Sequence, residues 1–98
     1  MRYEIILLPE AIQDLKRMTA RDAATVRDAL ERHLRGAPQK VSRSRIKRLT
    51  RISHPQYRLR VDSFRVYYDV IDDTVFVLAV VPKASAALWL DEWGSEEK

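Results

Sequence analysis

Residues 57–70 read YRLRVDSFRVYYDV, and apolar and polar side chains alternate on both sides of Asp62 and Ser63. A period of two is typical of β-strands with one buried face. If Asp62 and Ser63 form a two-residue loop, the apolar residues of both strands fall on one face, which supports this register. The segment therefore predicts an antiparallel hairpin in which Arg60 lies directly opposite Arg65.

This pairing concentrates positive charge, because Arg58 lies diagonally across from Arg65 on the same face. Like charges directly opposite each other destabilise a sheet by a few tenths of a kcal/mol or more. From Lys40 to Arg65 the chain has nine Lys/Arg and one acid, Asp62, whereas the remainder has nine Lys/Arg and thirteen Asp/Glu. Such crowding brings no stability, so it predicts a polyanionic partner, most often nucleic acid. The alternative is a solvated face on which the arginines splay apart.

The order of the other segments indicates an α+β fold. Pro9 suits the first turn of a helix, and Gly36 and Pro38 end a second one. The pattern predicts a single domain, residues 1–98, in which a two-helix hairpin packs on an antiparallel sheet. The expected elements are a strand over 3–8, helices over 9–18 and 21–35, a loop over 39–53 with one short strand at 46–49, the hairpin, a central strand over 75–81, and a short helix or tail over 84–93.

Composition excludes several classes of function. The 98 residues contain no cysteine, so disulfides and thiolate metal sites are impossible, and His33 and His54 are too few for a dedicated zinc site. With two glycines and no Gly-rich phosphate loop, a nucleotide cofactor is not expected. The longest apolar run, 75–81, is too short for a membrane span, and no signal-peptide pattern opens the chain, so we expect a cytoplasmic protein.

Four segments in this order resemble the RelE/ParE toxin superfamily, and the resemblance extends from about residue 3 to residue 90. It implies a toxin of a type II toxin–antitoxin system, neutralised by a protein antitoxin. In the RelE branch the toxin cleaves mRNA in the ribosomal A site without a metal or other cofactor. In the ParE branch it poisons DNA gyrase. The segments are LPEA at 8–11, KRL at 47–49, the hairpin at 57–68 and VVPK at 80–83.

The resemblance also implies site residues. Preorganised arginines suit the stabilisation of charge on a phosphorane. RelE-type enzymes often have lysines at the positions of Arg58 and Arg60, and a C-terminal Tyr or His where this chain has Trp89. Tryptophan stacks on bases but transfers no proton, so His54 and Tyr67 are the alternatives for that step. The expected catalytic residues are Arg58, Arg60, Arg65 and Lys83, and the expected RNA contacts are Lys47, Arg48, Arg51, Tyr67 and Trp89.

Three functions follow as hypotheses. The leading one is a ribosome-dependent mRNA endonuclease that inhibits translation. The alternative is a gyrase inhibitor of the ParE type, which the missing Tyr or His favours. A third is a nucleic-acid-binding module without catalysis. The terminal apolar residues suit an amphipathic antitoxin element, although they could also simply cap the core. These residues are Leu88, Trp89, Leu90 and Trp93.

Overall fold

A computed structural model describes residues 2–96 of the chain. Most of the helices and strands lie where the sequence pattern predicts them. In chain order they are β1 (Glu4–Leu7), α1 (Pro9–Lys16), α2 (Ala20–Leu34), β2 (Ile46–Arg48), β3 (Ile52–His54), β4 (Tyr57–Val61), β5 (Phe64–Ile71), β6 (Thr74–Pro82), a 3-10 turn (Lys83–Ser85), α3 (Ala86–Trp93) and β7 (Ser95–Glu96).

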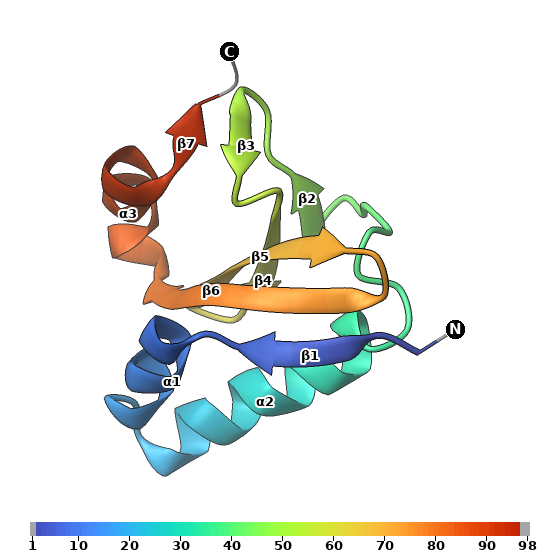
Figure 1. Ribbon diagram of the computed structural model, residues 1–98. Coiled ribbons are helices and arrows are strands. Elements are labelled where there is room, and N and C mark those ends of the chain that lie inside the picture. The colour runs from blue at the N-terminus through green and yellow to red at the C-terminus, as the bar shows by residue number, and fades with distance from the viewer. Residues whose placement is uncertain (1, 97–98) are drawn as a thin grey trace.

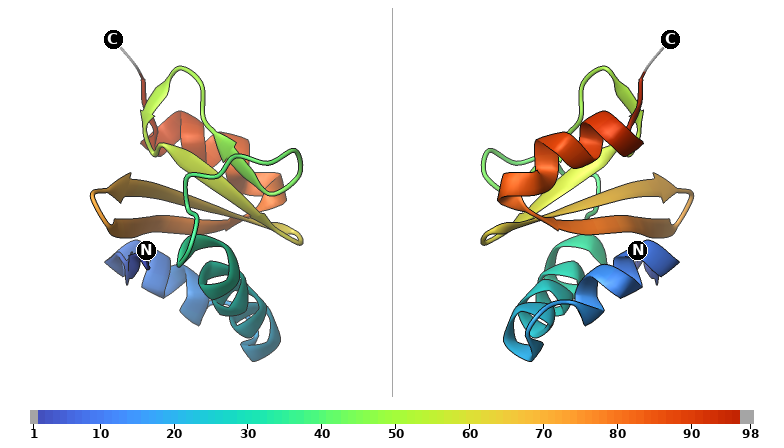
Figure 2. Two further views of the ribbon diagram at one scale, coloured as in Figure 1. Left: turned by 90° about the vertical axis from the view of Figure 1, so that its right-hand side faces the viewer. Right: turned by 90° about the vertical axis from the view of Figure 1, so that its left-hand side faces the viewer.

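The five-stranded sheet has the order β1-β6-β5-β4-β2. Its last four strands are antiparallel neighbours, whereas β1 pairs with β6 in parallel. The chain reaches β2 from β1 through α1 and α2, which lie together beneath the sheet (Figure 1). Figure 2 shows the sheet as a middle layer, with α1 and α2 on one side and α3 on the other. The architecture is the α+β fold that the sequence predicts.

The β4–β5 hairpin has the predicted register. Arg60 lies opposite Arg65, and Arg58 lies opposite Tyr67. The turn works because Asp62 adopts a φ of 49°, a left-handed conformation that aspartate tolerates better than most residues. The hairpin thus places the arginines on the face of the sheet that is turned away from α1 and α2.

The main core fills the space between the sheet and the two N-terminal helices. Thr19 caps α2 by accepting a hydrogen bond from the backbone N–H of Asp22, at 3.1 Å. On the sheet, Tyr57 and Tyr68 stack with their ring centroids 5.4 Å apart. The Tyr68 hydroxyl donates to the carbonyl of Pro38 at 2.6 Å, which ties the chain beyond α2 to the sheet. The two tyrosines are core residues, and burial raises the pKa of Tyr68.

One feature of the fold lies outside the sequence prediction. β3 and β7 form a separate two-stranded antiparallel sheet, whereas we expect a loop over residues 39–53 and the sequence pattern makes no prediction for 95–96. The strands have three and two residues, and Ile52 is their one apolar side chain, so periodicity gives no signal here. This small sheet lies beside α3, at the end of the molecule opposite α1 and α2 (Figure 1). Among residues 2–96, no helix combines the length and apolarity that a bilayer span requires.

Candidate functional site

The arginine face is the face of the five-stranded sheet opposite α1 and α2, and it bears Arg58, Arg60, Arg65, Tyr67 and Asp69. Part of this face is covered. A second apolar cluster forms on it from Leu49, Tyr67, Ala79 and Val81, with Ile52, Ala86, Trp89 and Leu90 packed against them. The arginine face is therefore partly covered by packed side chains and is not an open sheet surface.

Trp89 roofs the middle of the arginine face. Its ring stacks on that of Tyr67, with centroids 4.8 Å apart and planes within 7°. Tyr67 is consequently only 2% exposed, and its burial raises its pKa, an effect that Arg58 and Arg65 partly offset. The two rings that we expect to contact RNA, those of Tyr67 and Trp89, are thus stacked on each other. Tyr67 becomes available to a base only if α3 moves, whereas Trp89 remains half-buried and keeps part of its ring accessible.

The three arginines gather at the hairpin end of this face, but they are not equivalent. Arg60 is exposed and Arg58 is half-buried, whereas Arg65 is 7% exposed. Arg65 Nη1 donates to the carbonyls of Asp62 and Phe64, at 3.1 and 2.9 Å, so this guanidinium holds the turn. Arg60 therefore presents its charge to solvent, and half-buried Arg58 does so in part.

Electrostatics show that the arginines act on one another. Burial, followed by the charges of Arg58 and Arg60, lowers the pKa of Arg65 from its ordinary value. An arginine remains charged at neutral pH despite such a shift. Among the described residues no carboxylate forms an ion pair with any of the three. The result is a concentrated, uncompensated positive field.

Lys83 reaches the same end of the sheet. Its backbone N–H donates to the carbonyl of Ser63 at 2.7 Å, which places the start of the 3-10 turn beside the hairpin loop. The Lys83 side chain is exposed. The structure therefore brings together the four predicted catalytic cations, Arg58, Arg60, Arg65 and Lys83, at one edge of the arginine face.

The predicted RNA contacts on β2 separate onto two faces. Lys47 pairs with Arg58 and is exposed on the arginine face. Arg48, the next residue, pairs with Tyr57 and lies over its ring at 5.3 Å on the helix side. Its Nη1 also donates to the carbonyl of Gln56 at 2.7 Å. Lys47 thus joins the arginine face, and Arg48 is a packing residue of the sheet.

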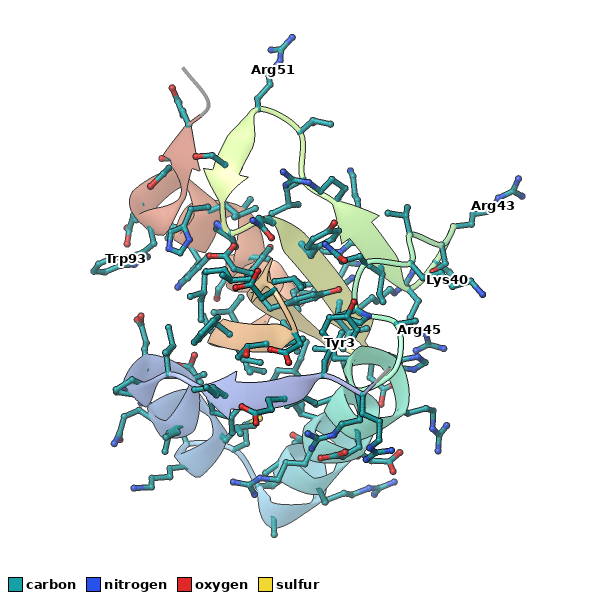
Figure 3. The ribbon with its side chains drawn as sticks, turned by 45° about the vertical axis from the view of Figure 1, so that its right-hand side comes forward. Tyr3, Lys40, Arg43, Arg45, Arg51 and Trp93 are labelled. Atoms are coloured by element: carbon teal, nitrogen blue, oxygen red, sulfur yellow. The ribbon has the colours of Figure 1, made fainter. Side chains whose placement is uncertain are left out.

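Two further groups of cations project from loops. Figure 3 shows Arg51 projecting from the tip of the β2–β3 connection, and Lys40 and Arg43 projecting from the loop that precedes β2. Arg51 adopts a φ of 62°, as the turn requires. These three side chains are exposed and free to contact a large partner.

A polar pair that the sequence analysis does not predict, His54 with Asp69, lies toward the other end of β5. Asp69 is 6% exposed, and its Oδ1 accepts the backbone N–H of Gln56 at 2.7 Å. Its Oδ2 contacts Nδ1 of His54, a residue whose side chain is 51% exposed. Alternation along β5 places Asp69 on the arginine face, but no periodic signal could reveal a partner 15 residues earlier.

The C-terminal helix has one packed side and one bare side. Trp89 and Leu90 pack on the second apolar cluster. Leu88 and Trp93 are 61% and 59% exposed, and Trp93 projects away from the molecule in Figure 3. Both expectations for this segment are thus met in part, because it caps the sheet and also leaves large apolar side chains in solvent.

Comparison with known proteins places the chain in a family. Residues 5–86 match the family model described as the ParE toxin of the type II toxin–antitoxin system, parDE. The match covers most of the sequence, and the chain belongs to this family. It is a toxin of the RelE/ParE superfamily, as the sequence resemblance implies. No curated protein matches the chain significantly.

Solved structures agree with this assignment. The toxin–antitoxin complex RelBE2 from Mycobacterium tuberculosis contains a chain 25% identical to this one, with a TM-score of 0.72 over 84% of this chain and 99% of that chain. The RelB–RelE complex from Methanococcus jannaschii gives 19% identity and a TM-score of 0.66, covering 86% and 96%. The YoeB dimer from Staphylococcus aureus gives 19% and 0.53, covering 81% and 94%. The last two matches support the fold.

Proposed function

We propose that this toxin inhibits translation as an mRNA endonuclease that acts on the ribosome, in the cytoplasm. The observation that carries the proposal is the uncompensated cluster of Arg58, Arg60 and Arg65, with Lys83 beside it. A polyanion binds where such charge is concentrated without carboxylates. The cluster lies at one end of a rigid hairpin, which suits a site that must hold a phosphate in one position.

The arginines differ in their proposed roles. Arg60 presents its guanidinium outward and Arg58 does so in part, where they can bind the scissile phosphate and the charge that develops on it. Arg65 keeps the hairpin turn in place through its two carbonyl contacts and adds to the field. Lys83 supplies a further point charge at the same edge.

Arg60→Gln tests the proposal, because Arg60 is exposed and its loss leaves the core intact. Removal of one preorganised donor should slow cleavage of ribosome-bound mRNA by on the order of 10²–10³-fold. Arg27→Gln is the matched control, since Arg27 is an exposed arginine of α2 in the opposite layer, and its loss should leave the rate unchanged. Equal rates for wild type and Arg60→Gln would contradict the assignment.

A gyrase inhibitor is the second candidate, and the matched family model favours it because that model describes ParE toxins. A shared fold does not fix the target. Supercoiling by purified gyrase separates the two candidates. Inhibition by wild type, together with intact mRNA in the ribosomal assay, would replace the endonuclease by this function.

We also propose that the chain binds a protein antitoxin. Two of the matched structures are toxin–antitoxin complexes, and Leu88 and Trp93 expose apolar area of the kind that an amphipathic partner helix covers. Co-expression with the product of the neighbouring reading frame should give a stable complex. Recovery of the toxin alone would speak against that partner.

A further inference from the structure

We propose that His54 is the group that takes the proton from the attacking 2′-hydroxyl, and that Asp69 positions it. The inference rests on the proposed endonuclease function and names the residue that performs its proton transfer. Trp89 cannot do so, and Tyr67 is buried beneath Trp89. His54 remains as a half-exposed imidazole held by a buried carboxylate.

The His54–Asp69 pair has a defined orientation. Asp69 Oδ2 is an acceptor, so the contact with Nδ1 places the ring proton on Nδ1 and leaves the lone pair on Nε2. Asp69 is itself fixed, because its Oδ1 accepts the Gln56 N–H at 2.7 Å. Gln56 is fixed in turn, since its Oε1 accepts the N–H of Val70 at 2.9 Å. Such a chain of contacts selects the tautomer with a free basic nitrogen.

The imidazole opens onto space that a nucleotide can fill. His54 lines a cavity of about 350 Å³ together with Leu78, Trp89, Trp93 and Glu10. This volume lies in the usual range for a small-ligand site. Indole rings are the side chains on which single-stranded bases stack. The cavity thus brings two indole rings and the His54 side chain to one space.

One arginine of the cluster, Arg58, lies diagonally across the hairpin from Asp69. Gln56, directly before β4, donates its N–H to Asp69, and Arg58 on β4 lies across from Tyr67, two residues before Asp69 on β5. Diagonal neighbours of this kind are roughly 7–8 Å apart, a gap that long side chains bridge. Arg58 Nε is buried without a protein partner among the described residues, so it has a hydrogen bond left to donate. A phosphate between Arg58 and His54 would meet both groups.

The chemical step balances without an oxidant or reductant. Nε2 of His54 takes the 2′-hydroxyl proton, and the 2′-oxygen bonds to phosphorus. The bond from phosphorus to the 5′-oxygen breaks, and water protonates the departing oxygen. The products are a 2′,3′-cyclic phosphate and a 5′-hydroxyl end, with Arg58 and Arg60 binding the negative charge of the phosphorane.

The test measures cleavage of a defined mRNA on purified ribosomes. His54→Asn keeps an amide at the Nδ1 position, and therefore the contact with Asp69, but has no Nε2. It should lose about 10²–10⁴-fold in cleavage rate while its thermal unfolding stays near that of wild type. His33→Asn changes the only other histidine, on α2, and should leave the rate unchanged.

A second arm separates proton transfer from structure. His54→Ala leaves a gap beside Asp69, and added imidazole should restore part of its rate in a concentration-dependent manner. Asp69→Asn donates to Nδ1, selects the wrong tautomer and should slow cleavage toward the lower end of the same range, with no rescue by imidazole.

The outcomes distinguish the two proposals. If wild type leaves the mRNA intact, the endonuclease function is wrong. If wild type cleaves and His54→Asn cleaves at the same rate, the function stands and the role of His54 is wrong. If His54→Asn is slow but imidazole does not restore His54→Ala, a proton-transfer role is also excluded, because a merely structural histidine gives this result.

Discussion

Buried charge in this toxin is confined to the arginine face. Arg65 and Asp69 are the charged side chains buried among residues 2–96, and both belong to β5. Each has its polar partners: two carbonyls for Arg65, and Gln56 and His54 for Asp69. An unpartnered buried charge is costly, so these contacts are needed for the fold to tolerate them. The opposite, helix-facing core is apolar, so buried charge among the described residues lies on the arginine face.

Asp14 offers a test of a single half-buried contact outside the arginine face. Its Oδ2 accepts the backbone N–H of Val80 at 2.9 Å. Burial raises the pKa of Asp14, and this outweighs the lowering by the Val80 hydrogen bond and by Arg17. Because the folded-state pKa lies above the unfolded one, folding disfavours the ionised carboxylate. The wild type therefore gains stability as the pH falls through the folded pKa.

Asp14→Asn keeps an acceptor for Val80 and removes the charge. At pH 7 it should be at least as stable as wild type, and its advantage should disappear as the pH falls toward about 4. Asp14→Ala should lose about 1–3 kcal/mol, because the Val80 N–H then lacks a partner. Urea denaturation at both pH values measures these differences. Equal losses for the Asn and Ala variants at pH 7 would contradict the role of the hydrogen bond.

At the scale of elements, α3 depends on its docking. An isolated helix of eight residues is unstable in water, so packing must hold α3 in place. The main contact is the stack of Trp89 on Tyr67, and Gly94 ends the helix through an N–H bond to the Leu90 carbonyl at 2.8 Å. Whatever loosens this stack uncovers Tyr67 and the middle of the arginine face.

Trp89→Ala should release α3 without unfolding the sheet. The stack is worth about 0.5–1.5 kcal/mol beyond the area it buries. Hydrogen exchange should therefore show loss of amide protection over 89–93, while β5 and β6 stay protected. Trp93→Ala is the matched control in the same helix, since Trp93 is largely exposed and should leave protection unchanged. Full protection of α3 in Trp89→Ala would show that the stack does not hold it.

The sequence predicts the hairpin to the residue because period-two alternation and a two-residue turn leave one register that buries all apolar side chains. The sequence predicts less where a strand is very short or where a contact joins segments that are far apart in the chain. The β3–β7 sheet has five residues, and Ile52 alone is apolar. The stack of Trp89 on Tyr67 and the contact of His54 with Asp69 join segments that no local pattern relates. The placement of Arg58, Arg60 and Arg65 on one face was therefore predictable, and the packing of Trp89 over that face was not.

At the scale of the whole molecule, the sheet separates the main core from the cationic face. α1 and α2 on one face make the main core, and the other face holds the cations under the partial cover of α3 and β3 (Figure 2). A charge therefore acts on a partner according to the side of the sheet it occupies, whatever its position in the sequence. Lys47 and Arg48 are neighbours in the chain on opposite sides of β2, so substitutions at these two positions can test this dependence.

Lys47→Gln and Arg48→Gln remove one positive charge each, but they should weaken different properties. For single-stranded RNA, the salt slope of log K falls by about 0.7 for each phosphate that the protein no longer neutralises, and Lys47→Gln should show this change at unaltered stability. Arg48→Gln should keep the slope and lose stability, because it gives up the hydrogen bond to the Gln56 carbonyl and the cation–π interaction with Tyr57, the latter worth about 0.5–1 kcal/mol. Salt titrations of RNA binding and urea denaturation of both variants measure the two effects. If both variants change the slope equally, RNA follows the cationic segment along the chain, and the arginine face is not the surface that binds it.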